Sequence, residues 1–282
     1  MKKLLAAVFV VVIATFSASG GASPFMPFSI NSNSTGYATR DLNVLEYLDF
    51  IGNSFVQNTF ASATPAIGDS FTFVDNGVFK VSGVDGVPQT VYSGNEITTT
   101  FIGGTGTGIL GGALTFTGGT LSFYSDSAQD YGANANTYGA ANGTLIGTFN
   151  LISGFGIVDN NALPNGLISL TFQAVTLAAN TWFDTAGNDL SFNPDVFNFV
   201  TTNATRLQSA SSNLTEQVVC GLGGFNCSGG GTPYDSPPFN FLVSNNGQDR
   251  MSTTIPEPGS LALIGIGLIG LSLLRRRVQL SA

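Results

Sequence analysis

The chain has 282 residues, a net charge of −8 and no histidine. A Ser-His-Asp triad, a Cys-His pair, a histidine-ligated zinc site and a histidine general base are therefore excluded. Only 9% of the residues are charged, and residues 23–256 hold four basic against sixteen acidic side chains. A surface of this sign repels phosphate groups, so nucleic acid is excluded as a partner.

The N-terminus has the organisation of a secretory signal peptide. Lys2 and Lys3 form a positive region, and Leu4–Ala14 is an apolar run of eleven residues. Small residues follow, with cleavage expected after Ala22 and, as the alternative, after Ser19. The apolar run is too short to span a bilayer comfortably. This order of a positive region, an apolar run and small residues predicts export by the general secretion machinery and removal of the segment by signal peptidase.

The sequence of the exported region predicts β-strands throughout. Ile168, Leu170, Phe172 and Ala174 alternate with polar residues, which is the period of a strand with one buried face. Residues 42–50 are the one stretch compatible with a helix, and the chain is rich in glycine (36) and phenylalanine (23). Many strands, glycine-rich turns and an aromatic core predict an all-β fold, a single β-sandwich-like domain.

Two turn signals predict β-hairpins inside this region. Asp75-Asn76-Gly77 separates residues 71–74 from 78–81, and Gly118-Gly119 separates residues 114–117 from 120–123. Asparagine and glycine tolerate the positive φ of tight hairpin turns. Each signal is therefore expected to end one strand and to begin the next.

Two short segments bear on cofactors. Residues 106–111 spell Gly-x-Gly-x-x-Gly, but a predicted hairpin follows them instead of a helix, so no nucleotide cofactor is expected. Asp184, Asn188 and Asp189 gather oxygen ligands around a glycine, and calcium prefers carboxylate and carbonyl oxygens. Because their spacing is not that of an EF-hand, two interpretations stay open: a solvated turn and a calcium site.

Cys220 and Cys227 are the only cysteines of the chain. In the oxidising compartment that follows export, the expected state is a disulfide between them. Closing so small a loop contributes about 2.5 kcal/mol in the chain-entropy model. A metal site would need additional thiolate or imidazole ligands, and the chain has none.

The C-terminus predicts a short membrane helix. The apolar segment 259–274 would rise about 24 Å as a helix, which is marginal for a bilayer but sufficient with local thinning. It is preceded by Pro256, Glu257 and Pro258 and followed by Arg275, Arg276 and Arg277. The arginines should stay cytoplasmic. The prolines, which oppose helix formation by the residues before them, then lie on the exported side.

This tail resembles the PEP-CTERM sorting signal of Gram-negative bacteria. The resemblance implies recognition by an exosortase, a membrane transpeptidase that cuts near the motif and releases or attaches the exported domain. Three short segments are further similar to flocculation-associated PEP-CTERM proteins: Ser23-Pro24-Phe25, Thr181-Trp182-Phe183 and an expected turn at Asn245-Asn246-Gly247. That similarity implies a role in retaining exopolysaccharide and clumping cells into flocs.

The expected organisation is a signal peptide over residues 1–22, an exported β-rich domain over 23–254 and the sorting signal over 255–282. The chain is expected to be anchored in the membrane transiently and to finish at the cell surface or in the extracellular matrix. The favoured function is a non-enzymatic matrix protein that associates with exopolysaccharide in flocs or biofilms. Two alternatives stay open: a calcium-dependent carbohydrate-binding module, and a histidine-free glycosidase that uses paired carboxylates.

Overall fold

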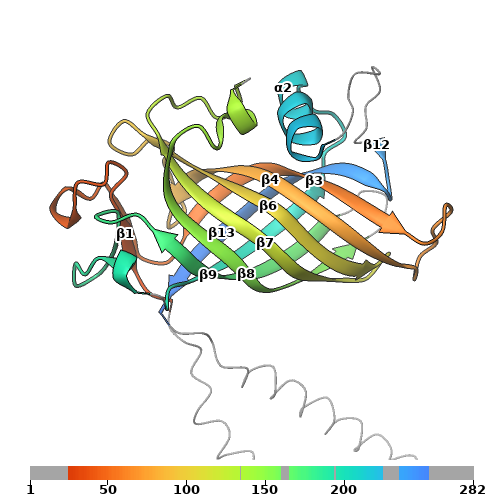
Figure 1. The fold of residues 1–282 in the computed structure, drawn as a ribbon, viewed down its shortest axis with the longest axis horizontal. Coiled ribbons are helices and arrows are strands. Elements are labelled where there is room, and N and C mark those ends of the chain that lie inside the picture. The colour runs from red at the N-terminus through yellow and green to blue at the C-terminus, as the bar shows by residue number, and fades with distance from the viewer. Residues whose placement is uncertain (1–24, 134, 160–164, 194, 225–234, 254–282) are drawn as a thin grey trace, which may run out of the picture. The chain divides into compact units, whose positions relative to one another are not determined.

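Eight long antiparallel strands form a closed barrel in the computed structural model (Figure 1). Strand β13 pairs with both β3 and β11, and β11 also pairs with β9. The order of the eight strands therefore closes on itself, and none of them is an edge strand. The barrel strands are β3 (Leu48–Phe60), β4 (Ser70–Val84), β6 (Glu96–Ile109), β7 (Ala113–Asp126), β8 (Thr144–Asp159), β9 (Asn165–Leu177), β11 (Phe197–Arg206) and β13 (Asn240–Ser252).

The structure describes residues 25–133, 135–159, 165–193, 195–224 and 235–253. The predicted signal peptide (1–22) and the predicted sorting signal (255–282) lie outside these residues. The described strands confirm the expectation of a β-protein, but the sandwich is corrected to a barrel. Local alternation could not distinguish the two, because closure depends on pairing between β3 and β13, which are far apart in the chain.

A small sheet covers one end of the barrel. It has the order β10-β1-β2 and consists of β10 (Trp182–Asp184), β1 (Phe28–Ile30) and β2 (Leu42–Val44). The ring of Trp182 contacts the rings of Phe123 and Phe149 of the barrel at centroid distances of 5.4 and 6.2 Å. Its Nε1–H donates to the Ile146 carbonyl at 2.7 Å. The single tryptophan therefore connects the small sheet to the barrel core. Residues 42–50, which the sequence left compatible with a helix, contribute to strands β2 and β3.

The helical residues lie outside the barrel wall. Helix α2 (Ser212–Leu214) continues into the π-helix η4 (Thr215–Leu222), and Ser211 caps the first turn by accepting the Leu214 N–H. Val218 and Val219 are buried in a cluster with Phe55 and Val78 of the wall. The sequence did not predict this helix. No helix in the described segments is long and apolar enough to cross a membrane.

The remaining described elements are short. They are the 3₁₀ helices η1 (Tyr37–Thr39), η2 (Asn136–Gly139) and η3 (Leu190–Phe192), strand β5 (Val87–Pro88), which pairs with β4, and strand β12 (Asp235–Ser236), which pairs with β13.

Both predicted hairpins are wrong. Asp75-Asn76-Gly77 lies inside β4, where the register shifts at a bulge, and Gly118-Gly119 lies inside β7. The expected turn at Asn245-Asn246-Gly247 lies inside β13. By contrast, the alternation predicted at residues 168–174 is confirmed, because Leu170 and Phe172 are buried and their polar neighbours are only partly covered.

Glycines inside these strands make room for phenylalanine rings. A Cβ atom at Gly106 would overlap the ring of Phe73, and one at Gly52 would overlap the ring of Phe79. The same holds for Gly104 and Phe101. In an eight-stranded barrel the interior is just wide enough for side chains to fill. These three glycines therefore serve close packing of the rings.

We predict that Gly106→Ala lowers the free energy of unfolding by about 2–3 kcal/mol, because the added methyl group would overlap both the Thr115 carbonyl oxygen and the Phe73 ring. Gly112→Ala is the matched control, since its Cβ would meet Ile109 at an ordinary 3.4 Å. Urea unfolding measures both variants. Equal stability of the two variants would contradict the packing argument.

Candidate functional site

Most of the residues that the sequence marks for sorting lie outside the described part of the chain. These are the motif Pro256, Glu257 and Pro258 and the cluster Arg275, Arg276 and Arg277. Cys220 lies in η4, whereas Cys227 falls in the segment that the structure does not describe. The disulfide therefore stays a prediction.

The predicted calcium candidates form a closed turn after β10. The carboxylate of Asp184 accepts the backbone N–H of Asn188 at 2.8 Å and its side-chain amide at 2.7 Å. The carboxylate of Asp189 accepts the N–H groups of Asn180 and Ser191 at 2.7 and 2.9 Å. The turn brings the three residues close together, but their oxygens already accept protein hydrogen bonds. Calcium binding at Asp184, Asn188 and Asp189 stays a prediction.

Two carboxyl groups that the sequence analysis missed lie inside the barrel. Asp75 of β4 and Asp249 of β13 line one interior pocket, together with phenylalanine rings and four other polar side chains: Ser54, Thr99, Thr202 and Asn245. A second pocket, toward the barrel end formed by the β6–β7 turn, also includes Asp75. An apolar cavity with a few converging polar groups is the usual form of a small-molecule site.

Burial sets the protonation of both groups. Desolvation raises the pKa of Asp75 from its ordinary value of 3.8 to about 7, and a hydrogen bond from Ser54 opposes this only in part. Desolvation raises the pKa of Asp249 to about 8, against a hydrogen bond from Asn198 and the charge of Arg250. At mildly acidic pH both groups are neutral, which is the form that an apolar interior favours.

The alternation of buried residues along the two strands could have identified Asp75 and Asp249 as inward-facing. Asp75 follows Phe71 and Phe73 at the two-residue spacing of one strand face, and Asp249 shares a face with Met251. The turn-like sequence around Asp75 concealed that alternation. Glycoside hydrolysis requires one carboxylate that is ionised at working pH. Asp75 and Asp249 both have raised pKa values, so at mildly acidic pH neither supplies that ionised carboxylate.

The outer wall carries an uncharged, exposed surface over β6, β7 and β8, which lie side by side in Figure 1. Phe155 and Ile157 are 60% and 62% exposed. Thr115 pairs in register with both Thr107 and Phe155. We call this surface the Thr–Phe face; it consists of Thr105, Thr107, Thr115, Thr117, Phe155 and Ile157. It combines an exposed aromatic ring with hydroxyl groups that donate and accept hydrogen bonds.

Comparison with known families finds the PEP-CTERM protein-sorting motif at residues 254–277. This match covers 24 residues and confirms the resemblance of the tail to the PEP-CTERM sorting signal. The motif indicates an exosortase-targeted protein of the cell surface or extracellular space, with exosortase as the processing partner. No curated protein and no solved structure matches the chain.

We predict that the barrel loses stability as the pH rises from about 4 to about 8. The folded pKa values of Asp75 and Asp249 lie above the unfolded value. The contribution of the two neutral carboxyl groups to the free energy of unfolding is therefore complete below pH 4. Its loss at high pH is on the order of 3 kcal/mol per group. Denaturant unfolding at several pH values measures it, and Asp75→Asn and Asp249→Asn should each flatten the curve.

Asp184→Asn serves as the control for this experiment. Partial burial acts to raise the pKa of Asp184. Hydrogen bonds from Asn188 and nearby backbone groups outweigh this effect and hold that pKa below its ordinary range. Its titration therefore lies below the tested window, and the slope above pH 4 should not change. A wild-type stability that is constant or increases from pH 5 to pH 8.5 would refute the assignment.

Proposed function

We propose that this protein is a non-enzymatic component of the extracellular matrix, and that its barrel associates with exopolysaccharide in flocs or biofilms. The observation that carries the proposal is the sorting motif at residues 254–277. A chain with this motif is addressed to the cell surface, where the barrel meets the polymers that the cell exports. The barrel itself supplies a closed sheet that leaves no long edge strand open to aggregation.

The Thr–Phe face is the surface that we assign to the polymer. An extended sugar chain presents apolar ring faces and many hydroxyl groups. Phe155 offers a ring for the apolar faces, and Thr107 and Thr115 offer hydroxyl groups on the neighbouring strands. The face contains no charged residue, so contact with the polymer would not depend on the polymer's charge.

We predict that loss of the sorting motif changes the location of the protein without unfolding the barrel. Deletion of residues 254–282 should move it from the cell surface to the medium, because exosortase no longer recognises the chain. The substitutions Pro256→Ala and Pro258→Ala should act in the same direction while leaving the apolar segment intact. Cell fractionation, combined with the melting temperature of the recovered protein, measures both effects.

Pro65→Ala, in the loop between β3 and β4, is the matched proline control and should be sorted normally. If Pro256→Ala and Pro258→Ala together leave the surface fraction unchanged, exosortase processing through this motif is excluded.

We predict that Phe155→Ala lowers retention of the purified protein on its own cell's exopolysaccharide several-fold, because it removes the exposed ring. Thr115→Val, which replaces one hydroxyl group with a methyl group, should lower retention less. Phe192→Ala is the control, since Phe192 is 83% exposed but lies in η3, away from this face. A polysaccharide pull-down measures all three variants, and the melting temperature confirms their folding.

The same assay separates the other two functional classes. A calcium-dependent carbohydrate-binding module would release the polymer when a chelator is added, and a glycosidase would generate reducing sugar. Either result, or equal retention by Phe155→Ala and Phe192→Ala, would contradict the role proposed for the Thr–Phe face.

A further inference from the structure

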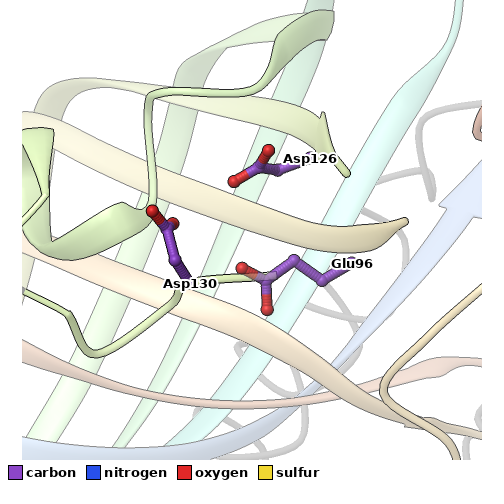
Figure 2. Close-up of side chains that lie close together, drawn as sticks. All are labelled: Glu96, Asp126 and Asp130. Carbon is purple, nitrogen blue, oxygen red and sulfur yellow. The ribbon is translucent and has the colours of Figure 1, made fainter. Parts of the chain in front are cut away.

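Three carboxylates meet on the outside of the barrel, near the end that carries the small sheet (Figure 2). Glu96 is the first residue of β6 and Asp126 the last residue of β7, and the two are direct partners in the register. Asp130 comes from the loop that follows β7 and lies over this part of the wall. One oxygen from each group lies within 4.8 Å of the other two.

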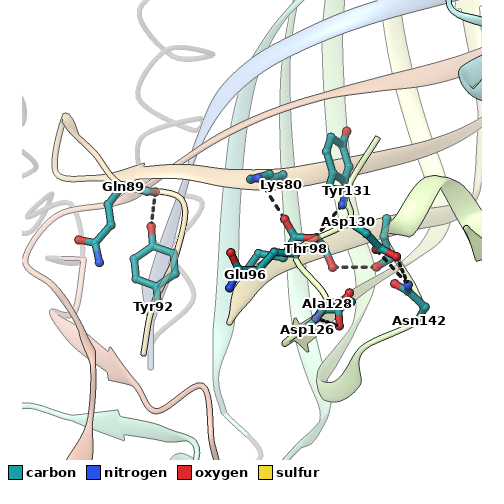
Figure 3. A network of polar contacts seen from close by, with 12 residues as sticks. Lys80, Gln89, Tyr92, Glu96, Thr98, Asp126, Ala128, Asp130, Tyr131 and Asn142 are labelled. Carbon is teal, nitrogen blue, oxygen red and sulfur yellow. Dashed lines mark hydrogen bonds and ion pairs between the residues drawn. The ribbon is translucent and has the colours of Figure 1, made fainter. Parts of the chain in front are cut away.

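The hydrogen bonds around this acidic cluster leave one oxygen without a partner (Figure 3). Glu96 is fully buried; its Oε1 accepts the Tyr131 N–H at 2.8 Å and its Oε2 lies 3.0 Å from Lys80 Nζ. Asp126 Oδ1 accepts the Ala128 N–H at 2.9 Å. Asp126 is only 6% exposed, yet its Oδ2 has no hydrogen-bond partner among the described residues.

The charges of the acidic cluster do not balance. Three carboxylates face one ammonium group, that of Lys80, which leaves a charge of about −2 when all are ionised. Like charges directly opposite on neighbouring strands destabilise a sheet, and a buried carboxylate needs a compensating charge. The loop nevertheless holds Asp130 against the pair, and its Asn142 amide donates to Asp130 at 3.0 Å.

We propose that Glu96, Asp126 and Asp130 bind a divalent cation, Ca²⁺, which clamps the loop that carries Asp130 onto the barrel wall. Calcium binds oxygen ligands at 2.3–2.6 Å, so ligands on opposite sides of the ion lie about 5 Å apart, and the 4.8 Å spread of the cluster fits inside that span. A charge of +2 neutralises the excess. The unpartnered Asp126 Oδ2 becomes a ligand, and calcium tolerates the irregular geometry that a strand end and a loop provide.

Hydrogen bonds to the wall and to helix α2 already hold the loop in place, so the cation adds to a prepared site. Thr98 Oγ1 donates to the Ala140 carbonyl at 2.9 Å, and Asn213 Nδ2 donates to the Gly132 carbonyl at 3.4 Å. Tyr131 O–H donates to the Val78 carbonyl at 3.0 Å. These bonds hold Asp130 near the two strand-end carboxylates without the metal, which lowers the entropy lost when the cation binds.

The test uses the purified full chain, titrated with CaCl₂ by calorimetry and melted in millimolar CaCl₂ or in chelator. We expect measurable binding heat and a rise in melting temperature of about 3–5 °C with calcium, and a smaller rise with MgCl₂. Asp126→Asn should remove both effects. Asp130→Asn, on the loop, is the second variant in case Asp126→Asn does not fold, and it should weaken binding at least tenfold.

Two further variants separate a cation site from a purely structural network. Lys80→Met removes the competing ammonium group, so it should lower the melting temperature in chelator but increase the shift that calcium produces. A structural ion pair alone would lower both melting temperatures equally. Glu46→Gln, at an exposed acid outside both acidic groups, is the control and should retain the full shift. Absence of calcium heat in the wild type, or a calcium shift that survives Asp126→Asn, would overturn the proposal.

Discussion

The fold depends on the packing of phenylalanine rings against glycine backbone inside a closed barrel. Several rings that point inward occupy space which a side chain on the neighbouring strand would otherwise fill, as Phe73 does over Gly106 and Phe79 over Gly52. Because interiors are close-packed, an extra methyl group at such a position has no free space to occupy. The same constraint leaves little interior room for polar groups, so each one found there is neutral or hydrogen-bonded.

That constraint also explains which parts of the fold the sequence predicted. The β-class and the buried face of β9 follow from local alternation, and both are confirmed. The hairpins at Asp75-Asn76-Gly77 and Gly118-Gly119 are wrong, because glycine marks a position without room for a side chain as readily as it marks a turn. Strands β4 and β7, of 15 and 14 residues, were thereby each divided into two shorter predicted strands. The barrel itself rests on the pairing of β3 with β13, which no local pattern contains.

The candidate sites likewise differ in whether the sequence alone could identify them. The sorting motif is a contiguous sequence, and the sequence alone was sufficient to identify it. The buried Asp75 was hidden by the false turn around it. Glu96 and Asp126 are thirty positions apart, and only the register of β6 and β7 makes them neighbours. Asp184 and Asp189, for which the sequence left a solvated turn and a calcium site open, accept hydrogen bonds within their own turn.

The positions of the Thr–Phe face and the acidic cluster bear on how calcium and polymer binding relate. Both lie on β7, with Thr117 near its start and Asp126 at its end, a separation of about 30 Å at the rise of an extended strand. This exceeds the Debye length of roughly 8 Å at physiological ionic strength, so the charge of a bound cation would not reach the polymer surface. Any coupling between them would have to pass through the strands, and a close-packed barrel resists such deformation. The structure therefore favours polymer contact that is independent of calcium, with the cation acting only on the loop that it clamps.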